Sequence, residues 1–447
     1  MTDLTYQGLL LDMSGHIKLN LQNGEAVIYS PYGSGKAFVL SDAALYVYEQ
    51  LANGLTLQEI LQSRDDTDWE ESLHAIIQFL LEEGLFGKKV PKQEKAKARR
   101  AKSVALWIHV TDACNLRCEY CYVHKGKRRL TKEACDAIVT ALHNDVEAQQ
   151  VKEVELKFAG GEPLIYTEII AYLVDQTKAK LEPLGVKVRL AIITNGTLVT
   201  EAKAHFLNEK GFSVMVSLDG LGSYNDARKY ADGRPSVEHV LQGIETLILA
   251  GIKPTILTTI SDKNVDGLWE LMQYVRGKGL TLSLSLSRDY EHGVGLTMNV
   301  DHVTSKMVAF LEQVSLLPDN ELPRLSFNGI QFDGSRTRIC GGGSNYFAVD
   351  PEANVCFCQM TVDKPLGRAL DRGGILPFAT HVETLGRDGV CGECLWRHVC
   401  CGGCAVLALS ANTLGEPSVM CELMKGVLPA ILVYEGRKIR RKEVRQT

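Results

Sequence analysis

Three cysteines near residue 118 have a spacing that suits a metal cluster. In the run Cys114-Asn-Leu-Arg-Cys118-Glu-Tyr-Cys121, three and then two residues separate successive cysteines. A [4Fe–4S] cluster takes one sulfur ligand per iron, so three thiolates leave one iron open to a small chelating molecule. A structural zinc site takes four ligands, and the nearby His124 is a weak fourth. The spacing therefore predicts a cluster with an open iron, with zinc or buried free thiols as the alternatives.

Most of the other cysteines gather near the C-terminus. Of the 13 cysteines, nine lie between Cys340 and Cys421. The N-terminus does not resemble a signal peptide, so we expect a reducing cytoplasm, where disulfides are rare and dense cysteine groups indicate metal binding or catalysis. The region is rich in Gly and Cys, and we expect that it needs metal to hold its fold. Paired Cys-x2-Cys and Cys-x3-Cys spacings also suit zinc.

The central part of the chain alternates predicted strands with predicted helices. The strand candidates are 104–110, 154–158, 188–193, 213–218, 254–259 and 280–286. An amphipathic helix begins at Thr131, and its apolar stripe includes Cys135, which we interpret as a core residue. Six β/α repeats predict an α/β fold whose parallel sheet curls toward a barrel, with the site at the carboxyl ends of the strands. After about residue 311 the periodicity breaks down.

Residues 1–90 are predicted to form a separate module. Two short strands at 25–30 and 36–40 precede three helices, the second of which begins with a capping box from Thr56 to Glu59. Residues 91–102 hold six Lys or Arg and one Glu, and we interpret them as a solvated linker. The net charge is −5, so nucleic-acid binding is not expected, and no apolar run is long enough to span a membrane.

The three-cysteine run, with the aromatic Tyr120 before its third cysteine, resembles the signature of the radical SAM superfamily, as do the ordered motifs at later strand ends over roughly residues 103–300. The resemblance implies that Cys114, Cys118 and Cys121 hold a catalytic [4Fe–4S] cluster whose open iron binds S-adenosylmethionine (SAM). It implies that Gly160, Gly161 and Glu162 hold the methionyl amino group, that Ser217 contacts the ribose, that Arg228 pairs with the carboxylate, and that Tyr120 and Asn195 also lie at the SAM site.

The C-terminal cysteine pattern is similar to the seven-cysteine SPASM domain, which houses two auxiliary [4Fe–4S] clusters. The resemblance implies an outer cluster on Cys391, Cys394, Cys400 and Cys421, and an inner cluster on Cys340, Cys358 and Cys404. The inner cluster would keep an open iron or take a fourth ligand from Cys356 or Cys401, and we favour the open iron because each of those cysteines lies beside an assigned ligand. The chain departs from the family at Ala353, where the usual residue is glycine.

The N-terminal module resembles the winged-helix-like element with which peptide-maturing enzymes bind the leader of a precursor. Together the resemblances imply a maturase that cross-links a ribosomally made peptide through a thioether or a C–C bond, with flavodoxin or ferredoxin as electron donor. Two alternatives are an oxidase of the sulfatase-activating type, which acts on a Cys or Ser of a protein, and a non-enzymatic, zinc-stabilised binding protein. No residue stands out as a base, although Tyr122, Asp289 and Tyr290 lie at plausible strand ends.

The predicted domains are then a leader-recognition module (1–90), a linker (91–102), a partial (β/α)6 barrel (103–310), a bridging region (311–338), a SPASM domain (339–430) and a basic tail (431–447).

Overall fold

The computed structural model describes most of the chain, namely residues 15–21, 24–64, 68–85, 102–288, 298–380, 382, 390–410, 417–418 and 420–443. The predicted linker lies outside the described residues except for Lys102, and Asp289 and Tyr290 lie outside them as well. Within the described ranges, no helix combines the length and the apolar character that crossing a bilayer requires.

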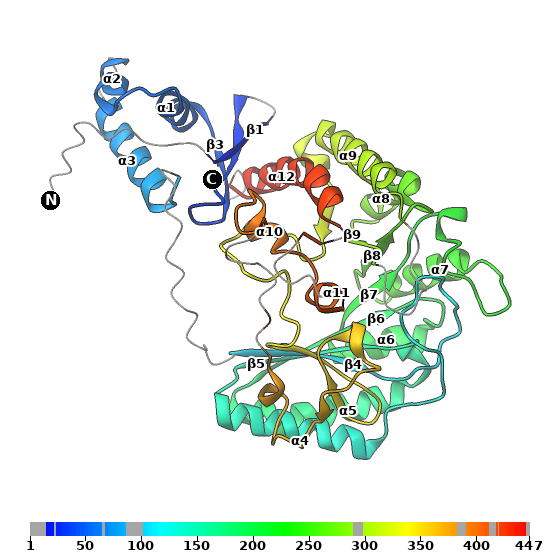
Figure 1. The fold of residues 1–447 in the computed structure, drawn as a ribbon. Helices are drawn as coiled ribbons and strands as arrows, with labels where there is room; N and C mark the ends of the chain where they lie inside the picture. The colour runs from blue at the N-terminus through cyan, green and yellow to red at the C-terminus, as the bar shows by residue number, and fades with distance from the viewer. Residues whose placement is uncertain are drawn as a thin grey trace.

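A parallel sheet forms the centre of the molecule (Figure 1). Its six predicted strands are β4 (Ser103–His109), β5 (Glu153–Ala159), β6 (Lys187–Thr194), β7 (Ser213–Ser217), β8 (Thr255–Ile260) and β9 (Thr281–Leu286). Each pairs in parallel with the next along the chain. The predicted strands are therefore confirmed, with ends that move by one residue. On β4, Leu106 and Ile108 are fully buried in the core, whereas Trp107 faces the other way, into a cavity.

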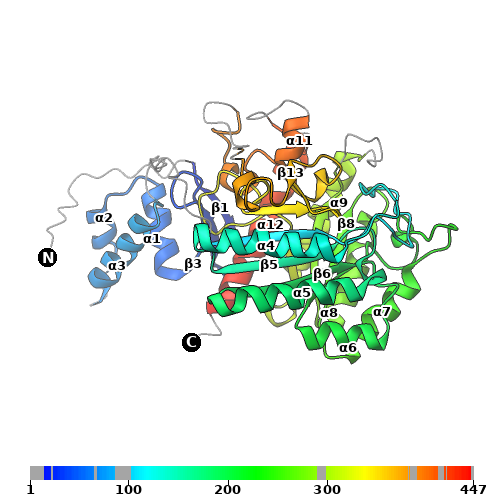
Figure 2. The same cartoon turned by 90° about the horizontal axis from the view of Figure 1, so that it is seen from below.

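The helices that follow these strands cover one face of the sheet (Figure 2). They are α4 (Lys132–Gln149), α5 (Thr167–Leu181), α6 (Glu201–Lys210), α7 (Val237–Leu249), α8 (Leu268–Gly277) and α9 (Val300–Leu316). Thr131 caps α4 by accepting a hydrogen bond from the backbone N–H of Ala134 at 3.2 Å. Cys135 is fully buried among the apolar side chains of α4, which confirms its interpretation as a core residue.

The sheet continues beyond the predicted strands at both edges. β10 (Arg324–Phe327) adds in parallel to β9, and β11 (Tyr346–Val349) adds in parallel to β4. The antiparallel strands β12 (Asn354–Cys356) and β13 (Gly367–Arg368) complete the order β10-β9-β8-β7-β6-β5-β4-β11-β12-β13. β10 lies in the predicted bridging region at 311–338 and was not predicted as a strand, because four residues are too few to show a period.

The N-terminal module has its own sheet and helices. The antiparallel strands are β1 (Ile17–Asn20), β2 (Ala26–Tyr29) and β3 (Ala37–Leu40), and the helices are α1 (Asp42–Ala52), α2 (Leu57–Gln62) and α3 (Trp69–Glu82). The three predicted helices, two strands and capping box are confirmed, whereas β1 was not predicted. In the capping box, Glu59 Oε2 accepts from the N–H of Thr56 at 2.8 Å, and Thr56 Oγ1 accepts from the N–H of Glu59 at 3.3 Å.

The basic tail expected at 431–447 is wrong for residues 431–443, which form part of the last helix. The C-terminal helices are α10 (Arg397–Cys400), α11 (Ala405–Ser410) and α12 (Cys421–Glu443). Residues 431–443 therefore belong to a helix that packs on the core, where Ile431 and Leu432 are fully buried. Arg437 donates to the carbonyls of Ser315 at 2.9 Å and Leu317 at 2.6 Å, near the end of α9. Its guanidinium N–H groups thus satisfy carbonyls at the end of α9 that have no helical N–H to accept from.

Ala353 adopts the left-handed conformation that its family position predicts for glycine. Its φ is +63°, and the residue is 4% exposed. The turn is held by Asp350, whose Oδ1 accepts from the N–H groups of Glu352 at 3.0 Å and Asn354 at 2.8 Å. The strained backbone of Ala353 is thus maintained by a buried carboxylate.

We predict that Ala353→Gly stabilises the protein by about 1 kcal/mol, because glycine removes the left-handed penalty of a Cβ. The matched control is Ala137→Gly inside α4, which should destabilise by about 1 kcal/mol because glycine is a poor helix former. Anaerobic urea denaturation of both variants measures the difference. A destabilising Ala353→Gly would show that packing of the Ala353 methyl group outweighs the strain.

Candidate active site

A cavity of about 600 Å³ lies inside the curved sheet and reaches the loops at the carboxyl ends of its strands. Both predicted cysteine triads line it, one made of Cys114, Cys118 and Cys121 and the other of Cys340, Cys358 and Cys404. The four cysteines predicted for the outer cluster line a separate, smaller cavity of about 30 Å³: Cys391, Cys394, Cys400 and Cys421. The structure therefore brings each predicted cysteine set together.

The three-cysteine loop supplies cationic and backbone donors to its sulfurs. Cys121 Sγ accepts a hydrogen bond from Lys125 Nζ at 3.0 Å, and Cys114 Sγ accepts from the N–H of Leu116 at 3.4 Å. Burial raises the pKa of Cys114 and Cys118, and Lys125 and Arg228, respectively, oppose that rise. Hydrogen bonds and cations of this kind stabilise sulfur ligands in their thiolate form.

The donor set of each site fits an iron–sulfur cluster, because it consists of cysteine thiols, whose thiolates are the usual ligands of such clusters. Burial raises the pKa of Cys400 to about 11, and the nearby Cys421, Cys391 and Cys394 add to the rise, as expected for thiols gathered around one small space.

Tyr120, Asp219 and Arg228 form a buried network behind the first triad. The Tyr120 hydroxyl donates to Asp219 and accepts from Arg228, and Arg228 Nη1 lies 3.8 Å from Asp219 Oδ2. Burial lowers the pKa of Arg228, but Tyr120, Cys118 and Asp219 raise it well above its usual value. Arg228 Nε is buried without a hydrogen-bond partner among the described atoms, and the residue lines the cavity. An unused donor on a fixed guanidinium suits a carboxylate ligand.

Asp219 was not assigned a role from the sequence. Its carboxylate also accepts from the N–H of Thr259 at 3.0 Å, and its own N–H donates to Asn225 Oδ1 at 3.0 Å. The sequence signal was an acidic residue at the end of a strand, nine positions before Arg228. Asp219 thus connects the segment after β7 to Thr259 of β8.

Gly160 and Gly161 allow the three-cysteine loop to approach β5 closely. A Cβ on Gly161 would lie 2.1 Å from the carbonyl oxygen of Ala113, and Gly160 has a φ of +131°. The N–H of Gly161 donates to the carbonyl of Thr111 at 2.6 Å. We had expected these glycines to admit a ligand. Both do line the cavity, but the backbone that their missing side chains admit is that of the cysteine loop.

Glu162 does not itself line the cavity, although its neighbour Gly161 and its hydrogen-bond partners Thr194 and Asn195 do. Its fully buried carboxylate accepts from Thr194 Oγ1 and the N–H of Asn195 at 2.8 Å each, and from the N–H of Leu164 at 3.0 Å. Burial raises its pKa despite these bonds. In this arrangement the carboxylate holds the end of β6 against the segment that follows β5, and its pairing with the amino group of SAM stays a prediction.

Asn195 and Ser217 both line the cavity, as expected of SAM contacts. The Asn195 amide group donates to Asn115 Oδ1 at 2.9 Å and accepts from the N–H of Thr197 at 2.9 Å, so it also anchors the cysteine loop. Tyr122 lines the cavity too.

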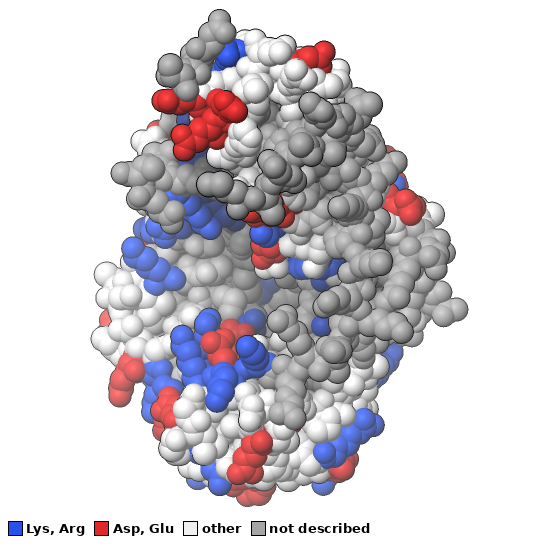
Figure 3. Space-filling model, turned by 90° about the vertical axis from the view of Figure 1, so that its left-hand side faces the viewer, with Lys and Arg blue, Asp and Glu red and all other residues white. Residues whose placement is uncertain are grey.

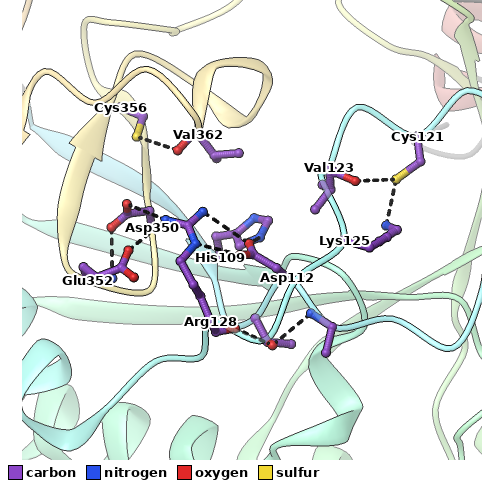
Figure 4. A network of polar contacts seen from close by, with 12 residues as sticks. His109, Asp112, Cys121, Val123, Lys125, Arg128, Asp350, Glu352, Cys356 and Val362 are labelled. Carbon is purple, nitrogen blue, oxygen red and sulfur yellow. Dashed lines mark hydrogen bonds and ion pairs between the residues drawn. The ribbon is translucent and has the colours of Figure 1, made fainter. Parts of the chain in front are cut away.

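A charged network holds the same loop on its other side (Figure 4). Asp112 contacts His109 Nε2 at 3.0 Å and accepts from Arg128 Nε at 2.7 Å. Burial raises the pKa of Asp112, but the bonds from His109 and Arg128 lower it below its usual value. Arg128 Nη1 also donates to Glu352 Oε2 at 2.9 Å and lies 3.6 Å from Asp350 Oδ2. The loop is thereby joined to the turn between β11 and β12.

Cys356 and Cys401 are not directed at either cavity. Both are fully buried. Cys356 Sγ donates to the carbonyls of Asn354 and Val362 at 3.8 Å, and Cys401 Sγ lies 3.5 Å from the carbonyl of His398. Neither residue lines the cavity that Cys340, Cys358 and Cys404 line.

Comparisons with known proteins agree with this arrangement. Residues 108–275 match the model of the Radical SAM superfamily. One relative is a protein of Methanocaldococcus jannaschii, 31% identical over 192 residues, which span 42% of this chain and 64% of that protein. The mycofactocin maturase of Mycolicibacterium smegmatis is 28% identical over 67% of this chain and 78% of its own length. The serine-type anaerobic sulfatase-maturating enzyme of Klebsiella aerogenes is 23% identical over 65% of this chain and 77% of its own length.

Two solved structures share the fold. The structure of anSMEcpe with bound AdoMet and a Cp18Cys peptide has a TM-score of 0.60 and 20% identity, and covers 76% of this chain and 98% of its own. The structure of Streptococcus suis SuiB bound to the precursor peptide SuiA has a TM-score of 0.52 and 14% identity, and covers 91% of this chain and 98% of its own. Residues 108–275 are thus similar to a radical SAM domain, and maturases are among the relatives of the chain, which supports SAM-dependent enzyme activity and opposes the non-enzymatic zinc alternative.

We predict that Glu162→Ala lowers the free energy of unfolding by about 3 kcal/mol, because three buried donors lose their acceptor. Glu162→Gln keeps one acceptor oxygen and should lower the free energy of unfolding by a smaller amount. The exposed Glu168→Ala on α5 is the control and should stay within about 0.5 kcal/mol of the wild type. If Glu162→Gln instead unfolds like the wild type and weakens SAM binding at equilibrium, the carboxylate contacts the ligand rather than β6.

Proposed function

We propose that this chain is a maturase that uses SAM to modify a ribosomally made precursor peptide. The observation that carries the proposal is the meeting of two cysteine triads in one cavity. The first, Cys114, Cys118 and Cys121, would hold the SAM-binding cluster. The second, Cys340, Cys358 and Cys404, would hold the inner auxiliary cluster with an open iron. Cys391, Cys394, Cys400 and Cys421 would hold the outer one.

When bound, the cluster that Cys114, Cys118 and Cys121 would hold would supply an electron for the cleavage of SAM to methionine and a 5′-deoxyadenosyl radical, which would take a hydrogen atom from the substrate. The chain's own residues would bind SAM and orient it. Arg228, fixed by Tyr120 and Asp219, would receive the SAM carboxylate on its unused Nε. Ser217, at the end of β7, would contact the ribose. The cavity wall formed by Trp107, Met215 and Leu257 would exclude water from the reacting atoms.

The auxiliary sites suit a net oxidation. Loss of a hydrogen atom leaves a substrate radical, and a thioether or C–C cross-link then requires loss of one more electron and one proton. A cluster held by the inner triad, which lines the same cavity as the first triad, would accept that electron. Flavodoxin or ferredoxin would supply the electron that starts the cycle. Each cross-link therefore removes two hydrogen atoms from the peptide.

The cavity and one face of the molecule favour anionic groups. Among the described residues that line the cavity, none is Asp or Glu, whereas Lys125, Lys157, Arg228 and Arg288 do line it. These cations oppose the charge of the thiolates and of the SAM carboxylate. Figure 3 shows a face on which Lys and Arg side chains gather beside a hollow, an arrangement that favours the approach of a peptide with acidic residues.

The N-terminal module supports a peptide substrate. Its three-stranded antiparallel sheet followed by three helices is compatible with a winged-helix-like element that binds the leader by strand addition. Among the described residues, the outer strand β1 is the edge at which a strand can add, whereas the start of β3 is already paired with Phe332 and Asp333. SuiB, which shares the fold, was solved with its precursor peptide bound. The second candidate, oxidation of a Cys or Ser in a protein partner, is favoured by the relationship to the sulfatase-maturating enzyme of Klebsiella aerogenes.

We predict that the triple variant Cys114→Ala, Cys118→Ala and Cys121→Ala forms at least 100-fold less 5′-deoxyadenosine than the wild type, because no ligands remain for the SAM-binding cluster. The assay uses anaerobically reconstituted protein, SAM and dithionite, with product detection by mass spectrometry. Cys135→Ala, which changes a core cysteine, is the control and should keep the activity. Undiminished 5′-deoxyadenosine from the triple variant would disprove the ligand assignment.

The substrate is tested with the short open reading frames encoded beside the gene. A true precursor should lose 2 Da per cross-link when incubated with enzyme, SAM and reductant, and the reaction should slow at least tenfold when its leader is removed. Modification that does not depend on the leader, or that occurs only on a folded protein, would favour the second candidate.

A further inference from the structure

Strand β2 joins the N-terminal module to the rest of the molecule. Its alternate side chains enter two different cores, since Ala26 and Ile28 pack in the core of the module, whereas Val27 and Tyr29 pack in the main core. Figure 1 shows the three strands of the module beside α10 and α12. The module is therefore held by what lies under the Val27 and Tyr29 face of β2.

One part of that support is the loop from 391 to 400. The Trp396 ring stacks on Tyr29 with the ring centres 5.7 Å apart and an interplanar angle of 11°. Arg397, which is 7% exposed, donates to the carbonyl of Pro31 through Nε at 3.1 Å and Nη2 at 2.9 Å. Its Nη1 donates to the carbonyl of Gly392 at 2.8 Å, and its guanidinium lies 4.2 Å from the centre of the Tyr32 ring. Arg397 thus ties the turn after β2 to this loop.

The other part of the support is α12. Gly436 lets the helix approach β2 closely, because a Cβ there would lie 2.7 Å from the Cβ of Val27. Arg440 Nε lies 2.9 Å from Glu25 Oε2, just before β2. The helix begins at Cys421. Both supporting elements therefore start at, or contain, cysteines of the predicted outer set.

The same residues that face the module also face the outer cysteines. Trp396 and Arg397 line the cavity of about 30 Å³ together with Cys391, Cys394, Cys400 and Cys421. The backbone N–H of Trp396 donates to Cys394 Sγ at 3.4 Å. A group bound in this cavity would link the 391–400 loop to the start of α12. Metal sites in cysteine-rich segments stabilise the local fold in this way.

We infer that the outer cysteine site is a clasp that fixes the N-terminal module on the enzyme, with Arg397 as the positioning residue. Filling the site joins two of the elements that support β2, and Arg397 links them to the turn at Pro31 through its hydrogen bonds. The inference rests on the proposed outer ligands and gives that cluster a mechanical role besides any electron transfer. Loss of the outer cluster would then release the peptide-recognition module from its place relative to the active-site cavity.

The test is hydrogen–deuterium exchange of the full-length, anaerobically reconstituted protein. Cys391→Ser with Cys421→Ser should make the amides of β2 and β3 exchange at least tenfold faster than in the wild type. The matched variant Cys340→Ser with Cys358→Ser removes inner ligands and should leave those amides within twofold of the wild type. Unchanged exchange in the outer variant, or equal acceleration in both, would overturn the clasp.

Iron and sulfide analysis of the same samples separates the two possible failures. An outer variant that keeps all the iron and sulfide of the wild type refutes the proposed ligands. An outer variant that loses about four irons but keeps slow exchange in β2 and β3 refutes the clasp alone.

Arg397 is tested through the cluster as well as through the module. Arg397→Met should speed exchange in β2 and β3. It should also speed the loss of outer-cluster absorbance to a chelator, because Arg397 links the module to the outer cysteine site. Arg397→Lys keeps the charge but not the forked donors and should restore part of both effects. Arg234→Met, at an exposed pair with Asp232, is the control. Unchanged chelation and exchange in Arg397→Met would remove Arg397 from the mechanism.

Discussion

The position of the loop that carries Cys114, Cys118 and Cys121 is the constraint on which the candidate active site depends. At its start, backbone lies so close to Gly161 that a side chain there would collide with Ala113. Farther along, Tyr120 is held by Asp219 and Arg228, which both follow β7. Because these contacts come from the ends of β5 and β7, a change in the sheet moves the sulfurs.

The second cysteine triad reaches the cavity because the sheet has an open edge. β11 adds in parallel to β4, with Tyr346 opposite Ala105 and Val349 opposite Ile108. The chain then turns through Ala353 into β12, which leads to Cys358 at the cavity. The network of Asp112 and Arg128 locks this turn to the first cysteine loop. One set of contacts therefore fixes the distance between both proposed cluster sites.

The sequence predicted long periodic elements and cysteine groups, and it failed where partners are distant in the chain. The six strands, the helix capped by Thr131 and the run from Cys114 to Cys121 could be predicted because their signals are local, whereas the two C-terminal cysteine sets followed only from the resemblance to the SPASM domain. β10 was missed because it is short and is specified by the free edge of β9. The helix at 431–443 was mistaken for a tail, since the carbonyls that accept from Arg437 lie more than 100 residues earlier. The use of Glu162 to hold β6 is likewise invisible without the fold.

The most direct test of the account is electron paramagnetic resonance of the reduced, reconstituted protein with and without SAM. We predict roughly 12 irons and 12 sulfides per chain, and a cluster signal that changes when SAM binds the open iron. The triple variant at Cys114, Cys118 and Cys121 should keep the other signals and lose the response to SAM. Zinc without sulfide, or a wild-type spectrum that SAM does not alter, would contradict the account.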